Sequence, residues 1–525
     1  MRVDWRRALI YTHRWLGIAG SLVFVTWFAS GIVMMYARMP ELTAEERRAR
    51  LAPIDLSAAR ISIADAARSA AACGAGGQPC ERARISMLGD RLVYRVQRRG
   101  EPITIFADTG EPLPQLTGEQ AIDLARRFAP EHASTLRYDA LLTDADQWTL
   151  IGDARRAMPL HRIALGDPDG TNIYVSAKTG DVVMKTDGSG RRWGYLGAVL
   201  HWIYFTPLRR HGPLWNAVII WSSLAGCVLC LSGLVWGVVR YSPSARYRLK
   251  REQSHTPYAG LMRWHHYAGL FVGLVSFTWI FSGLLSMDPW DWHPGTAPTR
   301  QQREAVTGGP LRLDAISVSA DVAQPFSTAA ALAETVRAAS ETKEIEIAQF
   351  RGEPFFVAHD APIRFDRDTL LAAARAAMPD VDVADAAWLE DYDAYYYDRD
   401  RTLSLPVLRV RYADPQRTWL YLDPRRGAIV RKEERLTRVN RWLYHGLHSL
   451  DFPFLYHRRP LWDIVVIALS VGGIVLSATT LVPAVHRLRR HVRRIEGGRH
   501  ATRFSARVSR RALDRPRRAG GGGVM

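Results

Sequence analysis

Two stretches of the chain, HRWLGIAGSLVFVTWFASG at residues 13–31 and HHYAGLFVGLVSFTWIFSG at residues 265–283, carry matching residues at the same offsets. Each begins with a histidine, has a glycine four residues later, contains a Thr-Trp pair and ends in Ser-Gly. Apolar composition alone does not produce such matches at one fixed offset without a gap. The repeat therefore indicates two tandem copies of one structural unit.

Both stretches lie in long apolar segments, although the whole chain of 525 residues is 47% hydrophobic, as in an ordinary soluble protein. Four segments have about the 20 residues needed to cross a hydrocarbon layer of ~30 Å. They are Ala8–Tyr36, Leu214–Val239, Ala268–Met287 and Leu461–Val482. The sequence thus predicts an α-helical membrane protein with a four-helix transmembrane bundle that comes from the tandem duplication.

The charged residues predict the orientation of these spans. The net charge of +18 lies in residues 1–7, 240–263 and 486–525, beside the ends of the spans, and the rest of the chain sums to zero. Lys and Arg next to spans mark the cytoplasmic side. Both termini and the middle loop are therefore expected inside, and no nucleic-acid partner is needed to explain the positive charge.

A second pair of matching segments extends the duplication. Pro213-Leu-Trp215 corresponds to Pro460-Leu-Trp462, and the twelfth residue before each proline is a histidine, His201 or His448. Both copies run in the same direction, since each first span passes from inside to outside. Parallel repeats pack about a pseudo-two-fold axis along the membrane normal, so equivalent residues are expected to face each other at equal depth.

These observations predict eight consecutive parts. They are a cytoplasmic N-terminus with the first helix (1–37), an external α+β domain (38–192), a rim segment with the second helix (193–240), a basic cytoplasmic loop (241–263), the third helix (264–287), a second external α+β domain (288–440), a rim segment with the fourth helix (441–485), and a basic, disordered tail (486–525). Prolines before the second and fourth spans predict short amphipathic segments at the membrane rim.

The two external segments mix helical and strand patterns. The expected helices are Ile61–Ala72, Gln115–Ala129, Thr328–Ala339 and Thr369–Ala377, and Thr117 with Gln120 forms a capping-box pattern at the start of the second. Asp108-Thr-Gly110 and Lys178-Thr-Gly180 predict hairpin turns, and further strands are expected around residues 345–358 and 407–430. Both segments are therefore expected to be small α+β modules.

The four cysteines fall into two pairs with different expectations. Cys73 and Cys80 flank a Gly- and Pro-containing loop in the first external segment, where an oxidising compartment permits a disulfide, so we predict one. Cys227 and Cys230 lie inside a span, without the strand and turn of a redox motif, and are expected to be small helix-packing residues.

Ionisable residues at membrane depth are candidates for function. His13 and His265 occupy equivalent places in the cytoplasmic half of the first and third spans, and His201 and His448 form a second duplicated pair at the outer end. A four-helix bundle can hold a planar macrocycle between facing imidazoles, which then fill both axial positions of a haem iron. The sequence therefore predicts two b-type haems held by these four histidines.

Other interpretations of the histidines remain open at this point. His266 and His445 are alternative ligands, because each is adjacent to, or one helical turn from, its favoured neighbour. Zinc is less favoured than haem because zinc sites usually combine closely spaced His and Cys, and no Cys is next to these histidines. A proton relay is disfavoured because the spans contain no well-embedded carboxylate.

The chain resembles the PepSY-associated transmembrane family over about residues 5–490. The resemblance is carried by the two H-x-x-x-G and Ser-Gly spans, by Arg441-Trp-Leu-Tyr-His-Gly-Leu-His448 and by Arg459-Pro-Leu-Trp-Asp463. The external modules are similar to PepSY domains at Thr117–Ala125 and Thr418–Val430. The chain departs from the family pattern at Ala478-Thr-Thr480, where a Ser/Thr-Gly would close the fourth span.

This resemblance implies a bacterial inner-membrane protein similar to ferrisiderophore reductases, with His13 and His265 binding the inner haem and His201 and His448 the outer one. It implies electron transfer to a periplasmic acceptor such as a ferric siderophore. The short cytoplasmic segments contain no nucleotide-binding glycine motif, so the donor, a quinol or a cytoplasmic reductase, is expected to be a separate molecule. The alternative is a non-catalytic regulatory membrane protein whose PepSY modules bind periplasmic peptides or proteases.

Overall fold

The computed structural model describes residues 4–73, 79–98, 100–249, 252–316, 342–359, 361–398 and 401–513, and only the backbone over 491–513. The chain divides into two compact units. The first unit contains Met1–Ala29, Leu224–Ile280 and Ile467–Met525, and the second contains Ser30–Ser223 and Phe281–Val466. The expected helix at Thr328–Ala339 lies outside the described residues.

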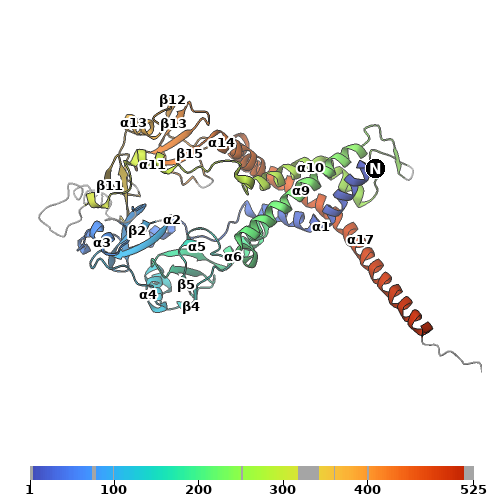
Figure 1. The fold of residues 1–525 in the computed structure, drawn as a ribbon, viewed down its shortest axis with the longest axis horizontal. Coiled ribbons are helices and arrows are strands. Elements are labelled where there is room, and N and C mark those ends of the chain that lie inside the picture. The colour runs from blue at the N-terminus through green and yellow to red at the C-terminus, as the bar shows by residue number, and fades with distance from the viewer. Residues whose placement is uncertain are drawn as a thin grey trace, which may run out of the picture. The chain divides into compact units, whose positions relative to one another are not determined.

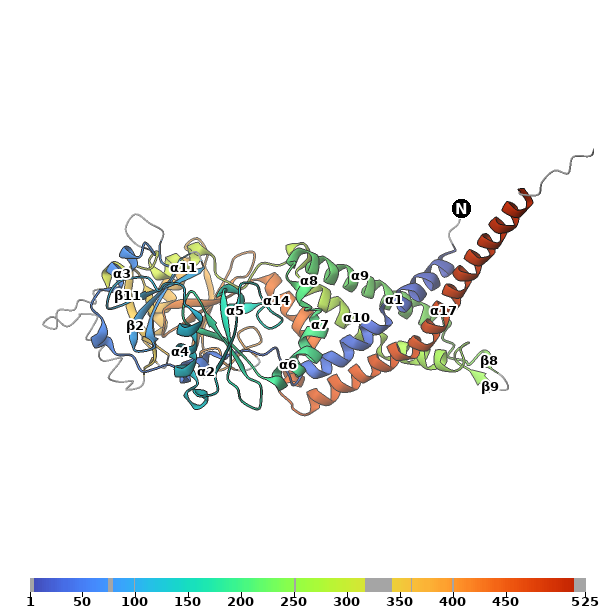
Figure 2. The same cartoon turned by 90° about the horizontal axis from the view of Figure 1, so that it is seen from below.

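Four long apolar helices pack together, as the sequence predicted (Figures 1 and 2). They are α1 (Trp5–Met34), α9 (Gly212–Arg240), α10 (Leu261–Leu285) and α17 (Leu461–Leu513), whose apolar part is Leu461–Arg490. Helix α10 begins before the predicted start of the third span, so His265 and His266 lie within it. All four are long and apolar enough to span a membrane, which indicates a multi-pass membrane protein.

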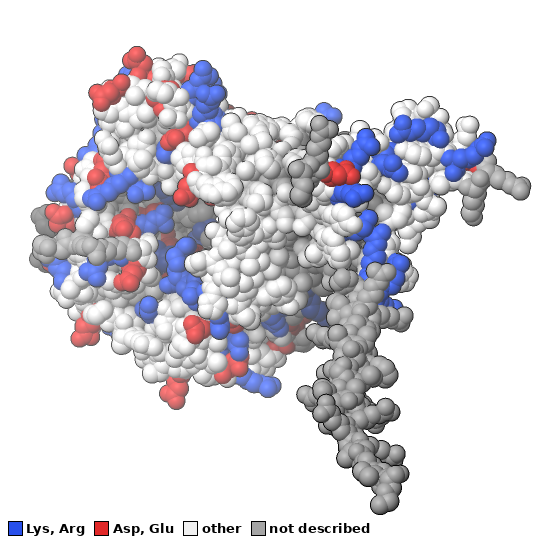
Figure 3. All heavy atoms as spheres, turned by 45° about the vertical axis from the view of Figure 1, so that its right-hand side comes forward, with Lys and Arg blue, Asp and Glu red and all other residues white. Residues whose placement is uncertain are grey.

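The outward surface of these helices supports that interpretation. Large apolar side chains are strongly exposed on them, among them Leu22, Trp221, Trp264, Phe271 and Ile464. The face in Figure 3 has a broad area almost without charged residues, and basic residues gather near the loop between α9 and α10. This loop contains a short hairpin, β8 (Tyr247–Leu249) and β9 (Glu252–Ser254). An apolar surface of this extent is suited to lipid rather than to water.

Helix α17 continues to Leu513, whereas the sequence predicted a disordered tail over residues 486–525. The prediction relied on the absence of apolar periodicity beyond about Arg499. Arg, Ala and Leu are good helix formers, and no proline interrupts the helix after Pro483, so local propensity favours a helix there.

The first external segment contains helices and seven strands within the described residues. The main elements are α2 (Ala44–Ala49), α3 (Ile63–Ser69), β1 (Arg82–Leu88), β2 (Arg91–Arg98), β3 (Glu101–Phe106), α4 (Gly118–Phe128), β4 (Arg137–Leu142), α5 (Gly152–Arg156), β5 (Leu160–Ala164), β6 (Asn172–Ser176), β7 (Val182–Thr186) and α6 (Gly188–Gly194). The capping box of Thr117 and Gln120 is present at the start of α4, as predicted.

The second external segment has a similar order of elements. They are α11 (Arg300–Thr307), β10 (Glu344–Phe350), β11 (Glu353–Ala358), α13 (Arg367–Ala377), β12 (Val383–Leu389), β13 (Val407–Tyr412), β14 (Trp419–Asp423), β15 (Ala428–Glu433) and α14 (Arg435–Arg441). The expected α+β character is confirmed in both segments.

All the strands pair in antiparallel sheets within the described residues. Two four-stranded sheets have the orders β4-β5-β6-β7 and β12-β13-β14-β15, and α4 and α13 cover one face of each. The turn between β6 and β7 requires Gly180, which has φ +73°, and an added Cβ there would lie 2.7 Å from Leu88 Cδ1. The hairpin predicted at this position therefore depends on glycine, which adopts a positive φ and leaves room for Leu88.

The third large sheet joins the two external segments. Its order is β11-β10-β1-β2-β3, and β1 pairs with β10 in the register Ile85 to Ile345. Both isoleucines are buried in one core that also contains residues of α3. Arg84 of β1 donates to Glu344 of β10 at 2.6 Å. The two segments therefore share a hydrophobic core, which sequence patterns within each copy do not reveal.

Each rim segment has the same irregular backbone. The first consists of a π-helix, η3 (Tyr195–Val199), followed by two short helices, α7 (Leu200–Trp202) and α8 (Thr206–Arg209). The second consists of a π-helix, η6 (Trp442–Gly446), followed by two short helices, α15 (Leu447–Ser449) and α16 (Pro453–Tyr456). Both short helices that carry a paired histidine end at a residue in the left-handed region, Ile203 or Leu450. The helix breaks predicted near these prolines are therefore present.

The cysteines of the first external segment are bonded to each other. Cys73 and Cys80 form a disulfide with Cα atoms 5.4 Å apart, and both are buried in the core shared by the two segments. Cys227 and Cys230 remain thiols on α9.

We expect a thiol-alkylating reagent applied to the unreduced, detergent-unfolded protein to label only Cys227 and Cys230. After reduction, Cys73 and Cys80 should be labelled as well, because the disulfide protects them beforehand. Peptide mass spectrometry distinguishes the two pairs, and labelling of Cys73 or Cys80 without reductant would contradict the assignment.

A buried histidine makes the first external segment sensitive to acid. His161 on β5 is 2% exposed, and its Nε2 donates to the Leu116 carbonyl at 2.9 Å while its Nδ1 lies 3.1 Å from the Tyr138 hydroxyl. Burial lowers the pKa of His161 below the ordinary value of 6.5. Below pH 6.5 the unfolded chain therefore binds a proton more readily than the folded one does.

We expect the full chain in detergent to lose thermal stability as the pH falls from 7 to 5, and His161→Gln to lose less over this range because the titrating group is gone. His359→Gln is the control, since His359 is exposed. Equal pH dependence of the two variants, measured by thermal unfolding, would refute the role of His161.

Candidate functional site

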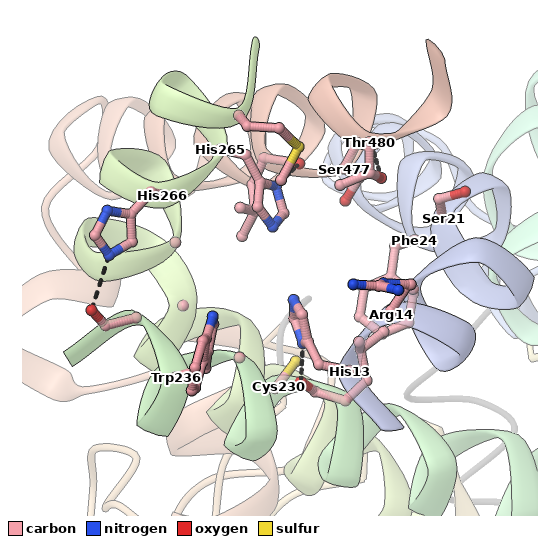
Figure 4. Close-up of a pocket in the computed structure, with 18 of the residues that line it drawn as sticks. His13, Arg14, Ser21, Phe24, Cys230, Trp236, His265, His266, Ser477 and Thr480 are labelled. Atoms are coloured by element: carbon pink, nitrogen blue, oxygen red, sulfur yellow. Dashed lines mark hydrogen bonds between the residues drawn. The ribbon is translucent and has the colours of Figure 1, made fainter. Parts of the chain in front are cut away.

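The first unit contains a cavity of about 250 Å³ lined by all four long helices (Figure 4). His13, His265 and His266 reach its wall, and most of the remaining lining is apolar. Five glycines also line it: Gly17, Gly233, Gly237, Gly269 and Gly273. Because glycines have no side chain, they leave space between the helices for a flat group. The repeated H-x-x-x-G motif thus contributes both a histidine and a glycine to this cavity in each copy.

His13 and His265 face each other in this cavity, as the duplication predicted. Their ring centroids are 6.1 Å apart and the ring planes are inclined by 43°. Two metal–nitrogen bonds of about 2 Å, with each nitrogen about 1.1 Å from its ring centroid, would place the centroids about 6 Å apart. The separation therefore fits two imidazoles that share one metal ion.

Hydrogen bonds to the backbone select the tautomer of both rings. His13 Nδ1 lies 3.1 Å from the Leu229 carbonyl oxygen, and His265 Nδ1 lies 3.1 Å from the Leu476 carbonyl oxygen. A carbonyl only accepts hydrogen bonds, so Nδ1 carries the proton in both neutral rings and Nε2 carries the lone pair. Metal-binding histidines commonly donate their second ring N–H in this way.

The position of the His13 ring depends on Gly233 of α9. A Cβ at this residue would lie 2.5 Å from His13 Cε1 and 2.9 Å from its Nδ1. In the second copy Thr480 takes the corresponding place and lines the cavity, while the hydroxyl of Thr479 lies 3.2 Å from His265 Nδ1. Thr479 therefore gives His265 a second polar contact beside the Leu476 carbonyl group.

The second unit contains the other duplicated pair. His201 and His448 have ring centroids 6.0 Å apart, with ring planes inclined by 77°. Ser30 Oγ lies 3.1 Å from His201 Nδ1, and Ser282 Oγ lies 3.1 Å from His448 Nδ1. The centroid separation again fits a shared metal ion.

The Ser-Gly motif that closes each of the two repeated spans supports this outer pair. The serine contacts the imidazole nitrogen, and an added Cβ on the following glycine, Gly31 or Gly283, would lie 3.6 Å from Cε1 of the same ring. The same contacts occur in both copies. The repeated sequence motif therefore corresponds to a repeated histidine environment.

The two alternative histidines have other partners. His266 is buried, its Nε2 donates to the Gly237 carbonyl at 2.8 Å, and its Nδ1 lies 2.7 Å from the Thr256 hydroxyl. With both nitrogens engaged, its ring is held by the protein itself. The ring of His445 packs against Tyr444, with centroids 4.6 Å apart. The facing geometry therefore favours His265 and His448 as the paired residues.

The donor set favours a metal that brings its own equatorial ligands. Within the described residues, no three His, Cys, Asp or Glu side chains come together as a metal site. A structural zinc ion requires four ligands, whereas haem iron needs only two axial ligands from the protein. Two facing imidazoles in a glycine-lined cavity are therefore a better fit to an iron porphyrin than to a zinc ion.

Several residues of the site were not predicted from the sequence. The carbonyl groups of Leu229 and Leu476 have no sequence signal, because every residue has one. Gly233 could have been noticed as a span glycine, but its contact with His13 depends on the packing of α1 against α9. Of the two arginines in the cavity wall, Arg487 was counted only as part of a basic flank, and Arg14 was not singled out.

Comparison with known proteins adds no assignment, since neither protein-family models nor curated protein sequences match this chain.

We expect Gly233→Ala to destabilise the protein by about 1–3 kcal/mol, because the new methyl group overlaps the His13 ring in a packed interior. Unfolding by sodium dodecyl sulfate from mild detergent micelles would measure this effect. Gly20→Ala is the control: its Cβ would make an ordinary contact with Phe24 at 3.4 Å, so stability should be unchanged or rise by up to about 1 kcal/mol. Equal stability of the two variants would contradict the overlap.

Proposed function

We propose that this protein is a di-haem b-type cytochrome of the bacterial inner membrane that transfers electrons from the cytoplasmic side to a periplasmic acceptor. The observation that carries the proposal is the geometry of the two histidine pairs, with ring centroids 6.1 and 6.0 Å apart. His13 and His265 are the proposed ligands of the inner haem, and His201 and His448 those of the outer haem.

The proposal includes a tandem duplication and a topology. The same carbonyl, serine and glycine contacts recur in both copies, which supports two parallel repeats. The basic flanks support a cytoplasmic location for both termini and for the loop between α9 and α10. The two external segments, proposed to be PepSY-like, then lie in the periplasm.

Haem iron, when bound, supplies a one-electron Fe(III)/Fe(II) couple. The protein's part is to hold two neutral imidazoles at a fixed separation. The carbonyl groups of Leu229 and Leu476 keep the proton of each inner ring on Nδ1, so that Nε2 is the donor atom. Haem iron held by two imidazoles would have no position left for oxygen, so these residues suit electron transfer rather than oxygen binding.

The reaction partners complete the proposal. The electron donor is a separate quinol or cytoplasmic reductase, since the cytoplasmic segments carry no nucleotide-binding motif. The acceptor is a ferric chelate such as a ferric siderophore, which makes the protein a haem-dependent ferric-chelate reductase. The family resemblance supports this acceptor, and it is the part of the proposal that depends on analogy.

We expect purified protein to show the reduced-minus-oxidised absorbance spectrum of bis-histidine haem, with two haems per chain. His448→Ala should reduce the haem content to one by removing an outer ligand, and His265→Ala should do the same at the inner site. His445→Ala and His266→Ala are the matched controls and should keep both haems.

A purified protein without haem would contradict the proposal and favour the non-catalytic PepSY-type regulator. Loss of haem from His266→Ala or His445→Ala, together with full retention in His265→Ala or His448→Ala, would show that the ligands are wrongly assigned.

A further inference from the structure

Two arginines belong to the wall of the cavity that contains His13 and His265. Arg14 follows His13 on α1, and Arg487 lies on α17. Figure 4 shows the Arg14 side chain at the edge of the cavity, near Phe24. Both guanidinium groups carry a positive charge at the wall of this one cavity. The cavity is therefore cationic on the side formed by α1 and α17.

No carboxylate balances these charges among the described residues that line the cavity. Within the described part of the chain, neither arginine forms an ion pair or a hydrogen bond, and Arg14 has only a cation–π contact with Tyr11 at 5.4 Å. Arg14 is half-buried and Arg487 is exposed at the cavity wall, so water solvates part of each charge. A concave wall that carries charges of one sign attracts ions of the opposite sign. The arrangement therefore indicates an anionic ligand.

The opposite side of the cavity is neutral, which breaks the symmetry of the duplication. His266 follows His265 as Arg14 follows His13, and its nitrogens are engaged by Gly237 and Thr256. Beside it, Trp236 donates to the Tyr258 hydroxyl at 2.8 Å.

The counterpart of Arg487 in the first copy also differs. Arg240 lies over the rings of Trp236 and Tyr247, at 5.5 and 5.8 Å, and is not among the described residues of the cavity wall. The ends of α9 and α17 correspond to each other, but only α17 contributes an arginine to the described cavity wall.

We propose that Arg14 and Arg487 bind the two carboxylate groups on one edge of a porphyrin, and so fix the orientation of the inner haem with its charged edge toward α1 and α17. This inference rests on the proposed function. Arginine suits the role because its planar fork of N–H donors matches a carboxylate. A lipid phosphate has similar chemistry, and the experiment below separates the two sources.

The test compares haem with its dimethyl ester, which lacks both negative charges, in binding to full-length apoprotein in detergent. We expect the inner site to prefer haem over the ester by about tenfold or more, and Arg14→Gln combined with Arg487→Gln to abolish this preference. The midpoint potential of the inner haem should fall in this double variant, because less positive charge then opposes the oxidised iron. Arg489→Gln, at an exposed position of α17 that is not among the described residues of the cavity wall, is the matched control and should behave as the wild type.

The outer haem reports whether each variant folds, since its ligands lie in the other unit. If the double variant does not fold, Arg14→Lys replaces it, because lysine keeps the charge without the fork and should weaken the preference for the free acid. Equal binding of haem and ester by the wild type, or an unchanged inner potential in the folded double variant, would overturn the inference.

Binding of a lipid phosphate by the arginines would give a different experimental result. If the arginines bind lipid phosphate, phosphatidylglycerol vesicles should stabilise the wild type more than the double variant, relative to phosphatidylcholine vesicles, with no preference between haem and ester. That result would overturn the inference and leave the di-haem proposal intact. Wild-type protein that binds no haem at all would overturn both.

Discussion

The hydrogen bond from a buried imidazole to a backbone carbonyl is the constraint on which the inner site depends. A histidine between apolar helices is tolerated only if its polar atoms are satisfied, and the carbonyl groups of Leu229 and Leu476 satisfy one nitrogen of each ring. This contact also orients the second nitrogen, because a carbonyl forces the proton onto Nδ1. One interaction thus fixes ring position, tautomer and the direction of the lone pair, which are the properties that a metal ligand needs.

The proposed duplication would explain how such sites arise in pairs. A single copy has one imidazole at each depth. Two parallel copies that pack about a two-fold axis place equivalent imidazoles opposite each other. The same symmetry would give the cavity two equivalent sides. The exchange of Arg14 for His266 at matching positions removes that equivalence, so a symmetric scaffold can bind a ligand whose two edges differ in charge.

The external segments follow a different principle. Each copy supplies one sheet with a helix on its face, but β1 and β10 come from different copies and pair in the middle of a third sheet. Burial of Ile85 and Ile345 in one core couples the two copies through hydrophobic contact, and the ion pair between Arg84 and Glu344 crosses the same strand pair. The external segments therefore act as one folded body rather than as two independent modules.

The sequence by itself determined the four long apolar helices and the α+β character of the segments between them, and it singled out a few candidate histidines, because these depend on hydropathy, spacing and turn residues that can be read locally. It left His265 and His266 unresolved. Neighbours on a helix point about 100° apart, so only the packing of adjacent helices decides which one faces His13. The carbonyl partners, the contact of Gly233 with His13, the pairing of β1 with β10 and the cationic side of the cavity were decided by tertiary structure, because each joins residues that are far apart along the chain.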